Sequence, residues 1–437
     1  MSRSPRPATW TALTFAAVGA LALSACTSPA SGETGAGDEE LTVLLISSHE
    51  GASQWLKDEY EKKTGVSINP VIVPYDEIGA KLSLDQQSGA NTIDVAAPWY
   101  VSIGDLAADG SIQDLSEWIE SDDEIDTEDF IPDIYDPYTL VAGKRYGLPF
   151  DGDTHVLFYN KEILERNGFT EPPATWDEYV AQAKAITENE SANGVYGAAV
   201  FGQKSPLILG ASFANRLAGF GGEFVGADGK PSINSPEAIA AAESLRDISE
   251  HALPTPAETA FGEGNAAWFN GKVAFIENWT DLGVGSQDPN TGSLVADKWG
   301  VVTLPVGDAS VESRASLVAG FTWVIAGNTD KTELAKDFIK WASSSEVNEA
   351  LLTSLPPTGI DPNRVSSLES DSYGEQYPEL QEVNRATLSG ALAWPTGENA
   401  GQAAQVLVDE LAKYLAGDGT AKETLDRVQS EWEELLG

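Results

Sequence analysis

Short apolar runs alternate with helix-like segments from the start of the mature chain. The apolar run at 41–46, which ends at polar residues, is predicted to be a buried parallel strand, and the runs at 66–73 and 93–96 are predicted to be further strands. Helix signals fill 53–63, and Gly65 stands at a C-cap position directly after them. Strand, helix, strand in this order predicts a parallel sheet with right-handed crossovers.

The same alternation resumes after residue 155 and predicts a second α/β lobe. Further strands are expected at 155–159, 299–305 and 321–326, where apolar and aromatic residues cluster. Polar N-cap residues predict the start of several later helices; two of these residues have Glu three positions on, and a third is followed by Pro at the first helical position. These predicted caps are Thr175, Ser235, Asp330 and Thr420.

The first forty residues resemble an export signal followed by a tether. Arg3 and Arg6 precede an apolar run at 10–23 that is short for a membrane span, and the run ends in Leu-Ser-Ala-Cys, a lipobox. Residues 1–25 are therefore predicted to be a signal peptide, Cys26 the lipid attachment site, and 26–40 a flexible tether. The alternative is an ordinary secretory signal with an incidental cysteine.

Composition excludes several classes of function. The formal net charge is −42, from 68 acidic and 26 basic residues, so binding to nucleic acid is excluded and an anionic substrate is disfavoured. The single cysteine rules out an intramolecular disulfide, and no stretch after the signal is long and apolar enough to cross a membrane. The acidic run 122–129 lacks the spacing of an EF-hand, and we expect a solvated connection between helices there.

Six segments of the chain resemble family 1 extracellular solute-binding proteins, the maltose-binding-like group. The matching segments keep the family's order and spacing over nearly the whole mature chain: 147–164, 172–179, 261–279, 299–305, 320–326 and 334–341. The resemblance implies an α/β, two-lobe, periplasmic-binding-protein-like fold (type II, maltose-binding-like). The lobes would be joined by hinge crossings, with ligand in the cleft between them.

The resemblance also implies the domain plan and the partners. The N-terminal lobe would comprise 41–152 plus about 318–346, and the C-terminal lobe about 153–317 plus 347–437. The protein is expected to be a monomer without cofactor or bound metal, and not an enzyme. It would be held by lipidated Cys26 at the outer face of the cytoplasmic membrane and deliver a neutral carbohydrate to ABC permease subunits and their ATPases.

Ligand contacts follow from the resemblance residue by residue. His49 and Glu50 match a sugar-contacting loop after the first strand, Asp153 a ligand-binding carboxylate beside a hinge, and Trp279 a sugar-stacking aromatic. A loop that also reaches the cleft contains Trp99 and Tyr100, and three further candidates are Asp151, Trp323 and Trp394. Ionised carboxylates accept hydrogen bonds from vicinal hydroxyls, and aromatic rings cover the C–H face of a sugar.

Other interpretations of the same residues stay open. Asp151 and Asp153 could cap a turn at the hinge, and Trp279 could pack in the core. The two carboxylates could also serve a secreted glycoside hydrolase, because their separation alone does not decide. A metal receptor would need clustered histidines, whereas His49, His155 and His251 are far apart in the sequence. A binding protein for a peptide or polyamine is the last alternative.

Overall fold

Two mixed β-sheets organise the part of the chain that the structure, a computed structural model, describes: residues 39–152 and 154–437. The predicted signal peptide, Cys26 and Asp153 lie outside these described residues, and so does the predicted tether up to residue 38. Within the described ranges no helix is both long enough and apolar enough to span a membrane.

The first sheet has the strand order β2-β1-β3-β12-β6. β1 (Glu40–Ile46) runs parallel to β2 (Ser67–Val73) and to β3 (Val95–Ala96), as the sequence predicts. β12 (Phe321–Ile325) is antiparallel to β3 and to β6 (Leu148–Asp151), so the sheet is mixed. The apolar run of β1 is buried on both faces, which is why it reads as continuous hydrophobic sequence.

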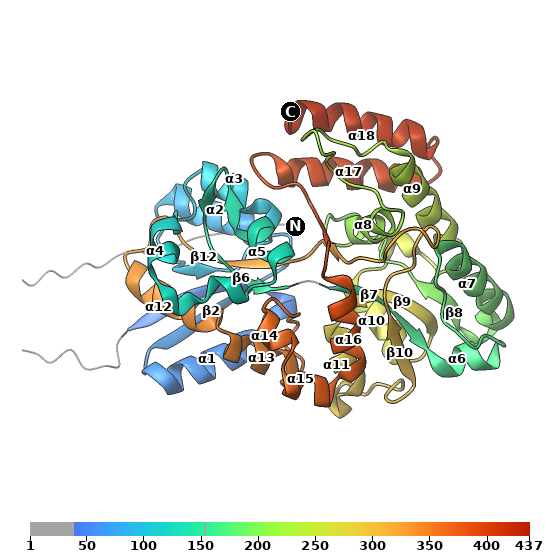
Figure 1. The fold of residues 1–437 in the computed structure, drawn as a ribbon, viewed down its shortest axis with the longest axis horizontal. Coiled ribbons are helices and arrows are strands. Elements are labelled where there is room, and N and C mark those ends of the chain that lie inside the picture. Colours follow the sequence, from blue (N-terminus) through green and yellow to red (C-terminus); the bar gives the residue numbers. More distant parts are fainter. Residues whose placement is uncertain (1–38, 153) are drawn as a thin grey trace, which may run out of the picture. The chain divides into compact units, whose positions relative to one another are not determined.

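Helices from two distant parts of the chain accompany this sheet (Figure 1). α1 begins at Glu50, earlier than predicted, and ends at Gly65, whose φ of 78° is the left-handed conformation that favours glycine. The set comprises α1 (Glu50–Thr64), α2 (Ile78–Ser88), α3 (Ile103–Ala108), α4 (Ser116–Ser121), α5 (Pro132–Thr139) and α12 (Thr332–Ala342).

The predicted cap of α12 by Asp330 is wrong. The helix starts at Thr332, and the residue before it, Lys331, makes no side-chain cap hydrogen bond. Asp94 orders the preceding turn instead, because its carboxylate accepts from the Thr329 hydroxyl at 2.6 Å and from Lys331 Nζ at 3.0 Å. A long-range carboxylate therefore replaces the local cap.

The second sheet has the order β10-β7-β9-β8. β7 (His155–Asn160) is antiparallel to β10 (Trp299–Val302) and β9 (Val273–Trp279), and β8 (Tyr196–Ala199) is parallel to β9. Six helices occur in this part of the chain: α6 (Lys161–Arg166), α7 (Trp176–Glu190), α8 (Leu209–Gly219), α9 (Pro236–Ser249), α10 (Phe261–Phe269) and α11 (Asp281–Gln287).

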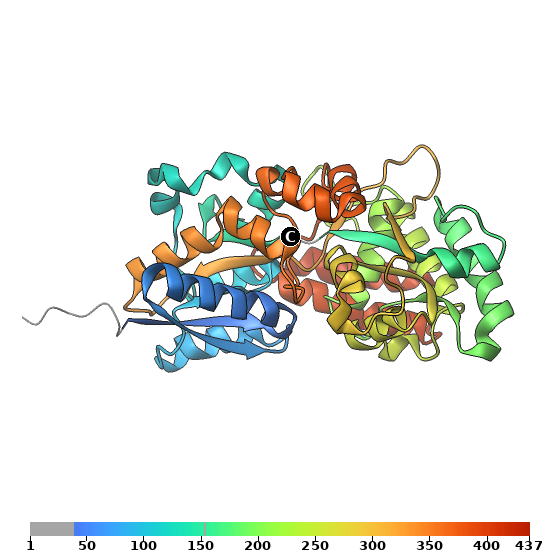
Figure 2. The ribbon, with the colours of Figure 1, turned by 90° about the horizontal axis from the view of Figure 1, so that it is seen from below.

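The helices of the C-terminal segment form two groups (Figures 1 and 2). One group lies near the bottom centre of Figure 1, and the other is a pair beside α8 and α9. α17 packs against α8 and α18 against α9, whereas α16 contacts β10. The bounds are α13 (Ser345–Thr353), α14 (Val365–Leu368), α15 (Asp371–Gln376), α16 (Pro378–Thr387), α17 (Ala400–Leu415) and α18 (Ala421–Leu435). The predicted caps at Thr175, Ser235 and Thr420 are confirmed, each by a side chain that accepts from a backbone N–H.

The chain passes between the two sheets at three places. The first passage joins β6 to β7, the second joins β10 to β12, and the third follows α12. The passages bring residues far apart in sequence together, as at Gly152, whose N–H donates to the Asp361 carbonyl at 3.3 Å. β12 belongs to the first sheet, in agreement with the predicted assignment of about 318–346 to the N-terminal lobe. The exact lobe boundaries stay a prediction.

Candidate functional site

A cavity of about 230 Å³ lies where the strands of both sheets end near these passages. Loops after β1 and β2, the start of β12, the end of β9 and helices α10 and α11 all contribute to its wall, together with the passage segments. The lining residues are Ile46, Ser48, His49, Tyr75, Asp151, Leu207, Phe261, Asn265, Asn278, Trp279, Asp281, Ala319, Phe321, Gly359 and Asp361.

His49 and Asp151 form one buried polar pair of this wall. His49 Nε2 lies 3.2 Å from Asp151 Oδ2, and the imidazole makes edge contacts with Phe150 and Phe321. Burial lowers the pKa of His49 to about 3, so the ring is neutral at physiological pH. A neutral ring facing a carboxylate donates through Nε2, which leaves Nδ1 as an acceptor; no described residue bonds to it.

Asp361 links the third passage to the first passage and to the end of β9 through its hydrogen bonds. One carboxylate oxygen accepts from the Thr154 N–H at 3.0 Å and the other from the Thr280 hydroxyl, while its own N–H donates to Asp151 Oδ1 at 2.8 Å. The side chain is only 2% exposed. Burial, and then the charge of Asp151, raise the pKa of Asp361 to about 7.

Asp281 completes a group of three carboxylates. It is the first residue of α11, two positions after Trp279, and it is half-buried at the cavity wall. Burial and then the charges of Asp361 and Asp151 raise its pKa to about 8. The three carboxylates do not converge as metal ligands: among the described residues no group of three or more His, Cys, Asp or Glu side chains is placed to hold a metal ion.

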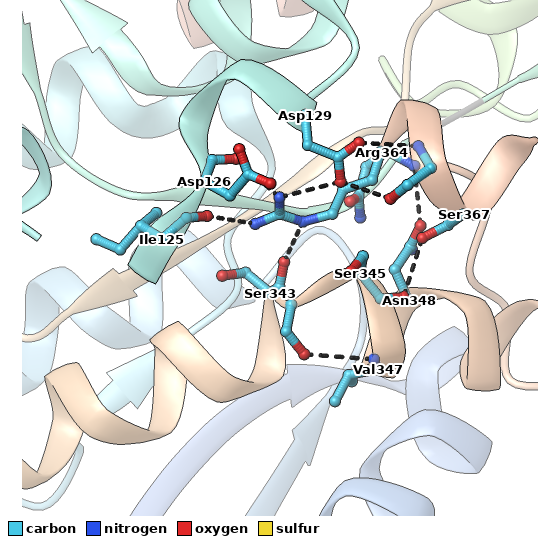
Figure 3. Close-up of polar contacts among 12 residues, drawn as sticks. Ile125, Asp126, Asp129, Ser343, Ser345, Val347, Asn348, Arg364 and Ser367 are labelled. Carbon is cyan, nitrogen blue, oxygen red and sulfur yellow. Dashed lines mark hydrogen bonds and ion pairs between the residues drawn. The ribbon is translucent and has the colours of Figure 1, made fainter. Parts of the chain in front are cut away.

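Arg364, three residues after Asp361, bonds to two distant segments of the chain (Figure 3). Its guanidinium is 2% exposed and donates to the carbonyls of Ser343, Ile125 and Asp126 at 2.6–2.9 Å. It also lies 3.4 Å from the carboxylate of Asp129. The acidic run 122–129, predicted to be a solvated connection, thus supplies the carbonyl and carboxylate acceptors for a buried arginine.

Aromatic rings form another part of the wall. The Trp279 ring contacts Phe261 edge-on at 4.8 Å and lies nearly parallel to Phe201 at 6.2 Å. Tyr75, from the loop after β2, contacts Phe261 at 5.7 Å, and its hydroxyl donates to Gln203 at 3.1 Å. These contacts join segments of the two sheet regions across the cavity. The Trp279 side chain is 9% exposed, and its indole N–H has no partner among the described residues.

The structure brings three of the predicted ligand-binding residues to this cavity: His49, Asp151 and Trp279. Trp99 lines a neighbouring cavity of about 330 Å³ that shares Tyr75 and Leu207 with the first. Its indole N–H donates to the Val318 carbonyl at 2.6 Å.

The other predicted residues lie elsewhere. Glu50 is exposed at the start of α1, and Trp323 is fully buried against Phe150 and Phe338. Tyr100 is fully buried, and its hydroxyl oxygen accepts from the backbone N–H of Trp394 at 2.8 Å. Trp394 itself stacks on Phe224 at 4.5 Å, so both pack in the interior. Of these four side chains none lines the first cavity.

Sequence reasoning missed Asp281, Asp361 and Tyr75. Asp281 follows the end of the β9 strand, where residues beyond a strand's carboxyl end are expected near a ligand, so its position was a usable signal. Asp361 stands in a Pro- and Gly-rich loop without periodicity, and only the three-dimensional path of the third passage brings it to the cavity.

With this geometry in hand, the comparison with known proteins assigns the family. The sequence family described as bacterial extracellular solute-binding protein matches residues 46–349, well over half of the chain. The chain belongs to this family of extracytoplasmic solute-binding proteins.

This chain spans most of the length of the curated relatives that it matches. A probable ABC transporter-binding protein of Deinococcus radiodurans is 30% identical over 69% of this chain and 71% of that protein. The diacetylchitobiose-binding protein DasA of Streptomyces coelicolor is 25% identical over 80% of this chain and 78% of that protein.

Solved structures confirm the two-lobe, maltose-binding-like fold. A solute-binding protein of Agrobacterium radiobacter in complex with ribitol superposes with a TM-score of 0.79 at 24% identity, covering 91% of this chain and 99% of that one. The maltose-bound MalE3 of T. maritima superposes with a TM-score of 0.77 at 22% identity, covering 90% and 99%.

Proposed function

We propose that this protein captures a carbohydrate or polyol in the cavity beside Trp279 and delivers it to an ABC importer. The observation that carries the proposal is the cavity itself, whose lining combines carboxylates with aromatic rings. Relatives whose names specify sugars or polyols, such as an arabinooligosaccharide-binding protein and an erythritol/L-threitol-binding protein, support the same class of ligand.

The chemistry of the wall suits hydroxylated ligands. Asp151 and Asp281 offer carboxylate acceptors for hydroxyl protons, and the unpartnered indole N–H of Trp279 can donate to a ligand oxygen. The Trp279 and Phe261 rings supply apolar area for the C–H face of a sugar. Asp153, which the structure does not describe, stays a predicted contact on the strength of the resemblance alone.

The remaining parts of the proposal concern location and mode of action. Lipidation of Cys26 would anchor the protein at the outer face of the cytoplasmic membrane, since diacylglyceryl supplies the two chains that stable anchoring needs. The protein would act as a monomeric receptor without covalent chemistry, and its ligand-bound form would engage permease subunits and their ATPases.

Isothermal titration calorimetry against hexoses, pentitols, hexitols and disaccharides tests the proposal. We expect a member of this panel to bind, and Trp279→Ala to weaken that binding at least about tenfold, because it removes a buried contact in the cavity. Trp118→Ala, on α4 and away from the cavity, is the matched control and should leave the affinity unchanged. Absence of binding by every panel member would refute the carbohydrate assignment.

The glycoside hydrolase alternative has its own test. Release of nitrophenol from nitrophenyl glycosides at a useful rate, abolished by Asp151→Asn, would overturn the assignment as a binding protein. We expect no such activity, because transport requires the captured solute to be released unchanged.

A further inference from the structure

The charge of the cavity wall is unbalanced. Asp151, Asp281 and Asp361 line it, yet no lysine or arginine stands among its described lining residues. His49, the one histidine among the described lining residues, is neutral at physiological pH because burial lowers its pKa. Buried charges in proteins are paired or neutralised, because desolvation of an unpaired ion is costly. The wall is therefore balanced either by protons retained on the carboxylates or by a positive charge from outside the described lining.

The hydrogen bonds of the three carboxylates show where that charge is missing. Asp151 is bonded by His49 and by the Asp361 N–H, and Asp361 by Thr154 and Thr280. Among the described residues, the one donor to the Asp281 carboxylate is the Leu282 N–H at the start of its own helix. Among the described residues its carboxylate therefore has the fewest hydrogen-bond donors of the three, and Asp281 lines the cavity.

Two further groups on the wall indicate what else the ligand must offer. The Trp279 indole N–H, on a side chain 9% exposed, and His49 Nδ1, on a side chain 1% exposed, have no partner among the described residues. One donates and the other accepts, as a hydroxyl group requires of its neighbours. A ligand that satisfies the whole wall carries hydroxyl groups as well as a positive charge.

We propose that the ligand is an amino sugar or amino polyol, whose protonated amino group pairs with Asp281 and whose hydroxyls reach Trp279 and His49. This inference rests on the proposed function and narrows its ligand class. The rings of Trp279, Phe261 and Tyr75 favour the same ligand, since aromatic faces attract ammonium groups within about 6 Å.

Without ligand, a proton takes the place of the ammonium. The titratable groups that act on Asp281 are Asp361, Asp151 and His49, and none of them carries a positive charge at neutral pH. Burial, and then the repulsion among the carboxylates, raises the pKa of Asp281 and Asp361 and so favours a retained proton on the cluster. When the ammonium enters, this proton leaves to the buffer, and the net charge of the cavity is unchanged.

The test compares hydroxylated compounds with their aminated counterparts by titration calorimetry at pH 7. Matched pairs are D-glucitol with 1-amino-1-deoxy-D-glucitol, and the corresponding hexose, pentitol and disaccharide pairs, with N-acetylated forms as uncharged controls. We expect the amine of the binding pair to bind at least about tenfold more tightly than its parent. Repeating the titration in buffers of different ionisation enthalpy should show proton release.

Asp281→Asn removes the charge and keeps the shape of the side chain. We expect it to reduce the ratio of the amine's affinity to the parent's affinity to less than about threefold, whatever its effect on the affinity of the parent compound itself. Asp371→Asn is the matched control, because Asp371 also begins a short helix but is exposed outside the cavity. It changes the net charge equally and should keep the full preference.

Each outcome decides between the two proposals. If a neutral parent binds as tightly as its amine, or Asp281→Asn keeps the preference, the inference of a cationic ligand is wrong and the proposed function survives. If no sugar or polyol binds in either form, the proposed function itself is wrong, and the inference fails with it.

Discussion

The ligand-free protein should become more stable at alkaline pH when Asp281 is replaced by Asn. A carboxyl group whose pKa is raised in the folded state favours folding while it is protonated, and it loses this contribution as the pH rises through the folded-state value. For Asp281 the pKa rises from 3.8 to about 8, so wild-type stability should fall across this range. Asn cannot ionise, so Asp281→Asn avoids that loss.

The structure sets the size of the effect. One pKa unit corresponds to about 1.4 kcal/mol, so a rise from 3.8 to about 8 would cost at most roughly 6 kcal/mol in the ionised form. Asp281 is half-buried, and access of water to its carboxylate reduces this cost. We expect Asp281→Asn to be about 2 kcal/mol more stable than wild type at pH 8 and equal to it near pH 4.

Urea unfolding followed by tryptophan fluorescence measures this difference at each pH. His49 is present in both proteins, so its own titration largely cancels in the comparison. Asp371→Asn controls for the change in net charge and should match wild type throughout, because its carboxylate is exposed. A difference that is constant with pH, or a variant less stable than wild type at pH 8, would refute the description of the carboxylate cluster.

Two further predictions concern the framework around the site. Glu277→Gln leaves the fully buried Arg216 without its counter-charge, now at 2.8 Å, and should cost about 3 kcal/mol in the free energy of unfolding; a loss below about 1 kcal/mol in urea titrations would contradict this. Gly152→Ala would place a Cβ 1.7 Å from the Pro362 carbonyl oxygen and should cost about 2 kcal/mol or more, whereas Gly262→Ala, with no atom within 4 Å, should be nearly neutral in thermal unfolding.

Much of the fold follows from local sequence, and the parts that do not are long-range. The strands at 41–46 and 155–159 and the caps at Thr175 and Thr420 depend on neighbouring residues, which the pattern displays. The failure at Asp330 has the opposite origin, because Asp94, more than two hundred residues earlier, orders that turn. Antiparallel insertion of β12 into the first sheet likewise leaves no local mark.

The site divides in the same way. His49 and Trp279 stand next to strands, so position along the chain and family resemblance predict that they lie close together. Trp323 and Trp394 show the limit of residue type as a guide, since a tryptophan serves a core as readily as a cavity. Asp361 could not be predicted as a site residue from local sequence, because only the path of the third passage brings it to the cavity. That path depends on the buried contacts of Arg364 with Ser343 and the 125–129 segment.

The carboxylate cluster also connects ligand charge to the passages between the sheets. Asp361 bonds Thr154 in the first passage, Thr280 beside β9 and Asp151 at the end of β6. Any group that changes the charge near Asp281 therefore acts on hydrogen bonds that cross from one sheet region to the other. Because hinge closure involves a few residues at the ends of elements, a ligand ammonium at this position would stabilise the closed arrangement through the same residues that bind it. If the ligand carries an ammonium group, binding and closure would depend on the same carboxylate charges, which a retained proton would neutralise before the ligand binds.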